Sequence, residues 1–142
     1  MKELVTSFVV PGNPVGKGRA RSTKSGHHYT PGKTVNYEET VGYIALQSMM
    51  GRQATIKACR IEVDVYQAIP KSASKTIKEL MCNGQIRPTI KPDTDNCLKS
   101  IKDACNRIVY ADDKQVVEDE IRKYYSPVAR TQVYIYTWSE VQ

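Results

Sequence analysis

Two aspartates separated by a single residue, Asp93 and Asp95, are the strongest candidates for chemistry in this sequence. If the segment that carries them is extended, both side chains point the same way, with Cα atoms ~6.6 Å apart. Two carboxylates that converge in this way raise a pKa or bind a cation. Hard oxygen ligands without a nearby histidine favour Mg²⁺ over zinc, so the pair predicts a magnesium site.

Further charged residues follow this pair at spacings that could bring them to the same site. Lys99 lies one helical turn after Asp95, where its ammonium group could neutralise charge on a phosphate. The pair Asp112-Asp113 comes later, and Asp113 could supply a third metal ligand. A straight helix over 96–108 would be ~20 Å long. Asp113 would then lie beyond the end of the helix that is opposite to Asp95. Either the following loop doubles back along the helix, or a neighbouring subunit completes the site.

Each of these residues also has a purely structural interpretation. Asp95 could be a helix cap, Asp112 and Asp113 a turn, and Lys99 a solvated charge, and taken singly these interpretations are favoured. Taken together, the residues indicate a site.

Two other acidic motifs fit poorly. A calcium-binding loop that starts at Asp93 would need glycine at its sixth position and glutamate at its twelfth, where this chain has Leu98 and Ala104. An Asp-x-Asp pair also occurs in nucleotide-sugar transferases, but the chain is short for their usual doubly wound domain. That function stays open as an alternative.

Positive charge is concentrated in one polar loop over residues 11–33. No acidic residue occurs between Glu3 and Glu38, and the chain as a whole has a formal net charge of +6. Such a loop favours a polyanionic partner. We interpret His27 and His28 as phosphate contacts or plain loop residues, because two neighbours without further ligands cannot complete a tetrahedral metal site. The basic residues of the loop are Lys17, Arg19, Arg21, Lys24 and Lys33.

Hydrophobic periodicity predicts strands that alternate with helices. Asp95 or Asn96 is the expected N-cap of the helix next to the acidic pair. The predicted elements are strands at 7–10, 60–66, 115–125 and 132–138, helices over 34–49, from the N-cap Ser74 to Asn83-Gly84, and over 96–108, and an extended segment over 85–92. This order predicts an α/β (α+β) fold with a mixed sheet and flanking helices.

The bulk composition is that of a small globular protein. The 142 residues suit one domain over 1–142, and 40% hydrophobic with 25% charged residues argues against disorder. No apolar run approaches the ~20 residues of a membrane span, and the N-terminus lacks the apolar core of a secretory signal. The four cysteines show no CxxC spacing, so we expect reduced core thiols.

The segment KPDTDNCLKSIKDACNRIVYADDKQVVEDEIRKYYS resembles the central signature of the RusA-type Holliday junction resolvases: Asp-x-Asp-Asn-Leu-x-Lys on a helix, then Asp-Asp and a strand with a basic end. The loop PGNPVGKGRARSTKSGHHYTPGKTVNYEE is similar to that of phage and prophage members. Together the two segments span about half the chain. The sequence departs from the pattern at Cys97, at Cys105 and in an extension over 69–90.

The resemblance implies specific residue roles. Asp93, Asp95 and Asp113 would bind Mg²⁺, for which Mn²⁺ can substitute, and Lys99 would act beside them. Lys123 would contact DNA together with the basic loop. The resemblance also implies a homodimer, because a four-way junction is cut at two symmetric strands.

The expected activity is therefore a crossover junction endodeoxyribonuclease of recombination and repair, in the bacterial cytoplasm and encoded by a phage, a prophage or the host. No small-molecule cofactor and no membrane partner are expected. Two alternatives remain: a non-catalytic DNA-binding protein, and a nuclease selective for flaps or forks.

Overall fold

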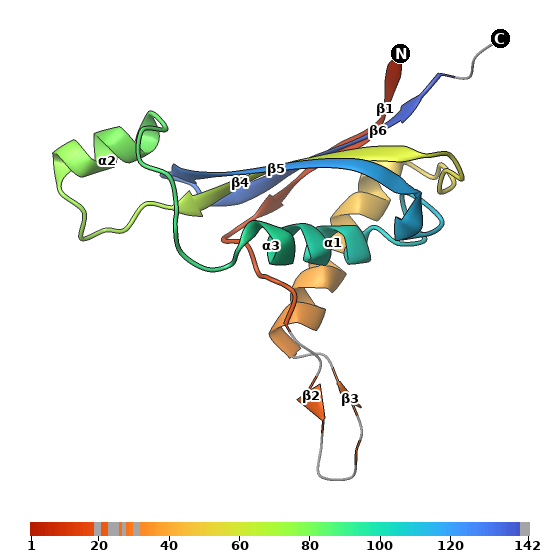
Figure 1. The fold of residues 1–142 in the computed structure, drawn as a ribbon, viewed down its shortest axis with the longest axis horizontal. Helices are drawn as coiled ribbons and strands as arrows, with labels where there is room; N and C mark the ends of the chain where they lie inside the picture. Colours follow the sequence, from red (N-terminus) through yellow and green to blue (C-terminus); the bar gives the residue numbers. More distant parts are fainter. Residues whose placement is uncertain (19–20, 23–25, 27, 30–31, 140–142) are drawn as a thin grey trace.

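The computed structural model describes residues 1–18, 21–22, 26, 28–29 and 32–139. One four-stranded mixed sheet carries the fold, with two long helices on one of its faces (Figure 1). The elements are β1 (Lys2–Pro11), β2 (Arg21–Ser22), β3 (His28–Tyr29), α1 (Gly32–Met49), β4 (Cys59–Ala68), α2 (Lys75–Cys82), α3 (Thr94–Ala104), the 3₁₀ turn η1 (Asp113–Gln115), β5 (Val116–Ser126) and β6 (Arg130–Trp138). The predicted α/β (α+β) class is confirmed.

The strand order in the sheet is β1-β6-β4-β5. β6 is antiparallel to both β1 and β4, whereas β4 and β5 are parallel. A parallel pair requires a crossover connection. Here that crossover contains α2 and α3, and it places α3 against the sheet.

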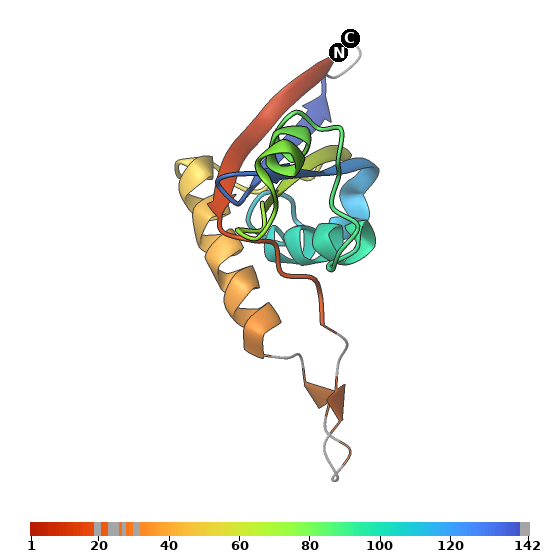
Figure 2. The ribbon, with the colours of Figure 1, turned by 90° about the vertical axis from the view of Figure 1, so that its left-hand side faces the viewer.

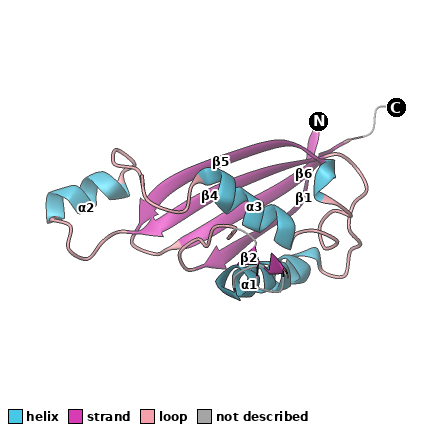
Figure 3. Cartoon of the chain, turned by 60° about the horizontal axis from the view of Figure 1, so that its bottom comes forward, coloured by secondary structure: helices cyan, strands magenta, loops and turns pink. Residues whose placement is uncertain are grey.

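The core lies between the sheet and the helices α1 and α3, which lie on the same side of the sheet (Figure 3). Side chains alternate along the strands as predicted: Val133 and Ile135 are fully buried, while Tyr134 and Tyr136 lie on the opposite face. α1 buries Val41, Ala45 and other residues along one stripe.

The opposite face of the sheet is open and consists largely of paired charges. Arg60 contacts Glu62 at 3.0 Å and Glu120 at 2.6 Å, and Arg122 contacts Asp64 at 2.8 Å. Because acidic neighbours neutralise both arginines, this cluster offers no excess positive charge to a polyanion. The same face also carries Arg130, whose guanidinium lies 4.0 Å from the ring centroid of Tyr66.

Two predicted boundaries of α3 are wrong. The helix begins at Thr94 with Asp93 as its N-cap, so neither Asp95 nor Asn96 is the cap. It ends at Ala104 rather than 108, and the chain then turns through Arg107, which has a φ of 67°. A left-handed residue there cannot continue the helix.

The remaining helices agree better with the sequence. Ser74 caps α2, and Asn83 ends it. All four cysteines are free, but only Cys59, Cys97 and Cys105 are buried, so the expectation of a core thiol is wrong for the exposed Cys82 on α2. α2 extends away from the body at one end of the sheet (Figure 1), and the strands β2 and β3 lie beyond the start of α1 (Figure 2).

Candidate active site

A pocket of about 370 Å³ lies between α3, η1 and β5, and we refer to it as the carboxylate pocket. The residues that line it are Asp95, Leu98, Lys99, Lys102, Asp103, Asp113 and Asp119. Four of these side chains are carboxylates and two are amines, so the pocket is strongly polar.

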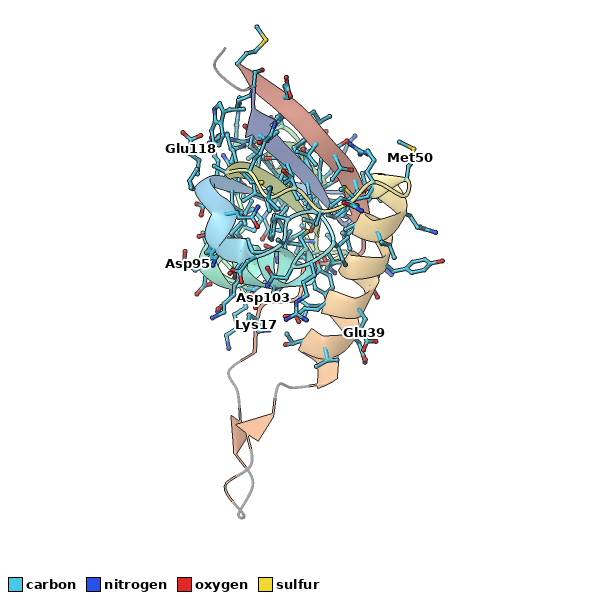
Figure 4. All side chains as sticks on the ribbon, turned by 90° about the vertical axis from the view of Figure 1, so that its right-hand side faces the viewer. Lys17, Glu39, Met50, Asp95, Asp103 and Glu118 are labelled. Carbon is cyan, nitrogen blue, oxygen red and sulfur yellow. The ribbon has the colours of Figure 1, made fainter. Side chains whose placement is uncertain are left out.

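The helix contribution to this pocket follows from its spacing. Asp95, Lys99 and Asp103 recur every four residues and therefore share one face of α3. Asp95 and Lys99 are exposed at the surface, whereas Asp103 is half-buried. In Figure 4, Asp95 and Asp103 lie near Lys17 at one edge of the body, away from Glu118 and Met50.

Asp113 reaches the pocket because the turn that carries it is fixed by hydrogen bonds. The Asp112 carboxylate accepts from the Lys114 amide at 2.9 Å, and the Asp112 amide donates to Gln115 Oε1 at 2.8 Å, which forms a capping box. Gln115 Nε2 in turn donates to the Thr55 carbonyl at 2.8 Å. Asp113 thus lines the same pocket as Asp95, as expected if the chain after α3 folds back toward the helix.

The acidic groups around Asp113 influence one another. Burial raises the pKa of Asp113, and the hydrogen bond and charge of Asp112 and the charge of Asp103 raise it further. The Lys114 amide lowers the pKa of Asp112. A cation would relieve the repulsion that Asp113 experiences.

Asp93 does not share the carboxylate pocket. Its carboxylate accepts a hydrogen bond from the Asn96 amide at 2.8 Å and closes the first turn of α3. The predicted extended geometry of the Asp93–Asp95 segment is therefore wrong, because the helix begins between the two residues. Asp93 instead lines a second, larger cavity on the other side of the α3 N-terminus.

The donor chemistry of the carboxylate pocket fits Mg²⁺, because its ligand atoms are carboxylate oxygens. Within the part of the chain that the structure describes, no three histidine, cysteine or acidic side chains lie close enough together to hold a metal ion. The pair Asp95 and Asp113, with Asp103 and Asp119 beside them, supplies the oxygen atoms from which a magnesium site could be built.

The second cavity, which we call the lysine groove, has a volume of about 1000 Å³. It lies between residues 14–18, the start of α1, the segment 88–92 and the start of α3. Four lysines line it: Lys17, Lys33, Lys91 and Lys123. Three of these were predicted to contact DNA, and all three predictions remain untested.

Lys123 also has a structural role at the groove. Its ammonium group donates to the carbonyls of Ile90 at 2.6 Å and Pro92 at 2.9 Å. It therefore joins β5 to the segment that leads into α3. Of the other predicted DNA contacts, Arg21 lies in β2 and Lys33 in the first turn of α1, whereas Arg19, Lys24 and the histidine His27 lie outside the described residues.

Lys17 is bound by two carboxylates in this structure. Its ammonium group lies 2.6 Å from Glu38 of α1 and 3.1 Å from Asp103 of α3. Burial lowers the pKa of Lys17, but the hydrogen bonds and charges of Glu38 and Asp103 outweigh this effect, so the pKa is raised above 10.5. Lys17 therefore joins the chain after β1 to both long helices.

Replacing Lys17 with methionine should lower the free energy of unfolding. The loss should fall between the ~0–1 kcal/mol of an exposed ion pair and the ~3–5 kcal/mol of a buried one. Because the pKa of Lys17 is raised, its contribution is complete below pH 10.5 and disappears as the pH rises through the raised pKa. Urea unfolding at neutral and at alkaline pH measures both effects, with the exposed Lys75→Met as control. An unchanged unfolding free energy at neutral pH would contradict this role.

Sequence reasoning missed several lining residues. Asp103 could have been found, because it lies on the Asp95 face of α3 two turns later. Asp119 could not, because its place beside α3 depends on how β5 pairs with β4. Lys91 gave no signal beyond its position two residues before Asp93.

Fold and pockets together describe a small α/β protein with a carboxylate pocket beside a basic groove, an arrangement typical of metal-dependent enzymes that act on phosphodiesters. A comparison with known protein families supports this class of protein. The family model described as Endodeoxyribonuclease RusA matches residues 11–136, so the chain belongs to the RusA family, and the resemblance inferred from its motifs is confirmed. A curated relative in Bacillus subtilis (strain 168), the "Uncharacterized protein YqaN", is 41% identical over 135 residues, which cover 90% of this chain and 93% of that protein.

Proposed function

We propose that this protein is a Mg²⁺-dependent endonuclease that resolves Holliday junctions by paired phosphodiester hydrolysis in DNA recombination and repair. One observation carries the proposal: Asp95 and Asp113, which are far apart in sequence, line one pocket with Lys99 in a chain of the RusA endodeoxyribonuclease family. The nuclease class follows from the family, and the metal, the substrate and the residue roles are the proposed part.

Three of the residues that line the pocket, Asp95, Asp113 and Lys99, have a role in this proposal. Asp95 and Asp113 would hold the metal, and Asp93 would join them if its carboxylate turned from the Asn96 amide toward the pocket. Mg²⁺ bound there would activate a water molecule and offset the charge of the attacked phosphodiester. Lys99 places its ammonium group one helical turn from Asp95, where it stabilises negative charge as it develops on the phosphate.

The proposed active form is a homodimer, because two sites related by a two-fold axis match the two strands that must be cut. A second subunit could also bring further ligand atoms to each site. We propose a location in the bacterial cytoplasm at the nucleoid, with a gene encoded by a phage, a prophage or the host. No helix among the described residues is long and apolar enough to cross a membrane.

We expect wild-type protein to nick a labelled four-way junction in both of two opposing strands when Mg²⁺ or Mn²⁺ is present, and to leave it intact in EDTA. A denaturing gel that compares a four-way junction, a fork and a linear duplex of the same sequence measures this. Faster cleavage of the fork would instead identify a nuclease selective for forks or flaps. Binding of all three without cleavage in any metal would leave a non-catalytic DNA-binding protein and overturn the proposal.

A further inference from the structure

One wall of the lysine groove is formed by residues 14–18 and is tightly fixed. The Lys17 amide donates to the Asn96 carbonyl at 3.0 Å, and Ser100 Oγ donates to the Val15 carbonyl at 2.8 Å, so this wall is tied to α3. At Gly16 the packing leaves no room for a side chain, because an added Cβ would lie 2.7 Å from the Cβ of Pro92. This wall is therefore in direct contact with Pro92, which belongs to the opposite wall of the groove.

The opposite wall, residues 87–92, is tied to the sheet. Arg87 Nε donates to the Lys123 carbonyl at 2.6 Å, and its guanidinium lies 4.1 Å from the ring centroid of Tyr124. The Lys123 ammonium group donates hydrogen bonds to the carbonyls of Ile90 and Pro92. Gln67 Nε2 donates to the Lys91 carbonyl at 3.1 Å. Both walls are thus preformed, which lowers the entropic cost of binding a ligand between them.

The groove has an excess of positive charge. Among the described residues that line it, the single carboxylate is Asp93, which accepts a hydrogen bond from the uncharged Asn96 amide and keeps its charge. Lys17 is neutralised by Glu38 and Asp103, and Lys123 donates only to uncharged carbonyls. Lys33 and Lys91 are exposed, and neither forms an ion pair with any residue that the structure describes. Three lysine charges therefore face the one charge of Asp93, which leaves the groove a net positive charge for an anionic ligand.

The size and lining of the groove fit one nucleic-acid strand. A volume of about 1000 Å³ is at the upper end for sites that enclose a drug-sized molecule, so it holds a few nucleotides and is too small for a duplex. Among the described residues that line it there is no aromatic side chain on which a base could stack, and proline and aliphatic side chains form the apolar part. This lining suits contacts to phosphates and sugars.

The groove also leads to the carboxylate pocket. Asp93 lines the groove and Asp95 lines the carboxylate pocket, and these residues lie on either side of the first residue of α3. On the open face of the sheet, Arg60 and Arg122 are neutralised by acidic neighbours and Arg130 lies over the Tyr66 ring, and none of these three arginines lines the carboxylate pocket. A strand held in the groove would thus arrive beside the carboxylates.

From these observations we propose that the lysine groove binds a single DNA strand by its phosphates, through Lys33, Lys91 and Lys123, and guides it from the branch point into the carboxylate pocket. This inference rests on the proposed nuclease function and adds the path of the substrate strand. It predicts that the groove distinguishes a single strand from a duplex, and that strand binding does not require a metal.

The first test measures binding in EDTA, where no cleavage occurs. The double variant Lys33→Gln, Lys91→Gln should bind a fluorescein-labelled oligothymidine more weakly than wild type, and its salt slope should be smaller by about 1.4, at ~0.7 per lost phosphate contact on a single strand. The control is Lys2→Gln, Arg52→Gln, which removes the same charge at the start of β1 and just after the end of α1, outside the groove. An unchanged slope, or an equal loss in the control, would overturn the proposal.

The second test locates the strand directly. A photo-crosslinking benzoylphenylalanine at Thr89, which lines the groove, should crosslink to the single-stranded arm of a fork. The same group at Thr40, on the exposed side of α1, should not. Crosslinks from Thr89 to duplex DNA alone, or none at all, would contradict the proposed path. Neither readout involves cleavage, so a failed nuclease assay and a failed groove assay are separate results.

Discussion

Replacing Asp95 or Asp113 with asparagine should reduce Mg²⁺-dependent cleavage of a four-way junction by more than ~100-fold, since losing even an outer partner of a metal ligand costs ~10–100-fold. Binding of the junction should persist or strengthen, because negative charge is removed from a pocket that faces DNA. Both side chains keep their shape in this change, so the fold should be retained. Single-turnover cleavage and gel-shift titration of the same protein measure the two effects separately.

The control for these variants is Glu39→Gln, which makes the same chemical change on an exposed residue of α1, away from both cavities (Figure 4). It should cleave like wild type. Cleavage by Asp95→Asn at the rate of Glu39→Gln would show that the carboxylate pocket is not the active site.

Asp93 needs a different argument, because its carboxylate caps α3. Asparagine is as good an N-cap as aspartate, so Asp93→Asn should unfold at nearly the wild-type temperature. If Asp93 also binds the metal, as proposed, cleavage by this variant falls as it does for Asp95→Asn. Full activity of this variant would show that Asp93 caps α3 and does not bind the metal.

Replacing Tyr110 with alanine should lower the free energy of unfolding by about 3–5 kcal/mol, the usual cost of removing a large buried aromatic side chain. Tyr110 is fully buried, and its hydroxyl donates to the Lys102 carbonyl at 2.6 Å near the end of α3. Burial raises its pKa, so the hydroxyl stays protonated and remains a donor. Urea unfolding followed by circular dichroism measures the loss.

A graded series separates packing from hydrogen bonding. Tyr110→Phe keeps the ring and leaves a buried carbonyl without this donor, so it should cost about 1–3 kcal/mol. Tyr43→Ala, whose side chain is exposed on α1, should change the unfolding free energy by no more than about 0.5 kcal/mol. Equal values for Tyr110→Ala and Tyr43→Ala would show that the buried Tyr110 side chain does not stabilise the fold.

Local signals predicted the local structure well. Alternation in β4 and β6, the Ser74 cap and the end of α1 at Met49 depend on neighbouring residues and appear in the structure. The start of α3 was misplaced because Asp93, Asp95 and Asn96 are all good caps, and only the preceding backbone decides among them. That error also placed Asp93 and Asp95 on one side of an extended segment.

The partners of Lys17 and the lysine groove depend on tertiary contacts, so they could not be predicted from the sequence. Lys17 was predicted to contact DNA from its place in a basic loop, but its pairing with Glu38 and Asp103 depends on how two distant helices pack. The lysine groove is likewise formed by four separate segments, and no motif marks Lys91 as part of it. The family motif identified Asp95, Lys99 and Asp113, which do meet in one pocket, while their metal-binding roles remain predictions.

The position of β6 in the sheet has a consequence for synthesis. β6 is the last strand in the sequence, yet it lies between β1 and β4 in the middle of the sheet. A growing chain therefore cannot pair β1 within the sheet until β6 has left the ribosome, and until then β1 and β4 both offer unpaired edges. We expect nascent or prematurely terminated chains to lack nuclease activity and to depend on chaperones, so that DNA is exposed only to finished molecules.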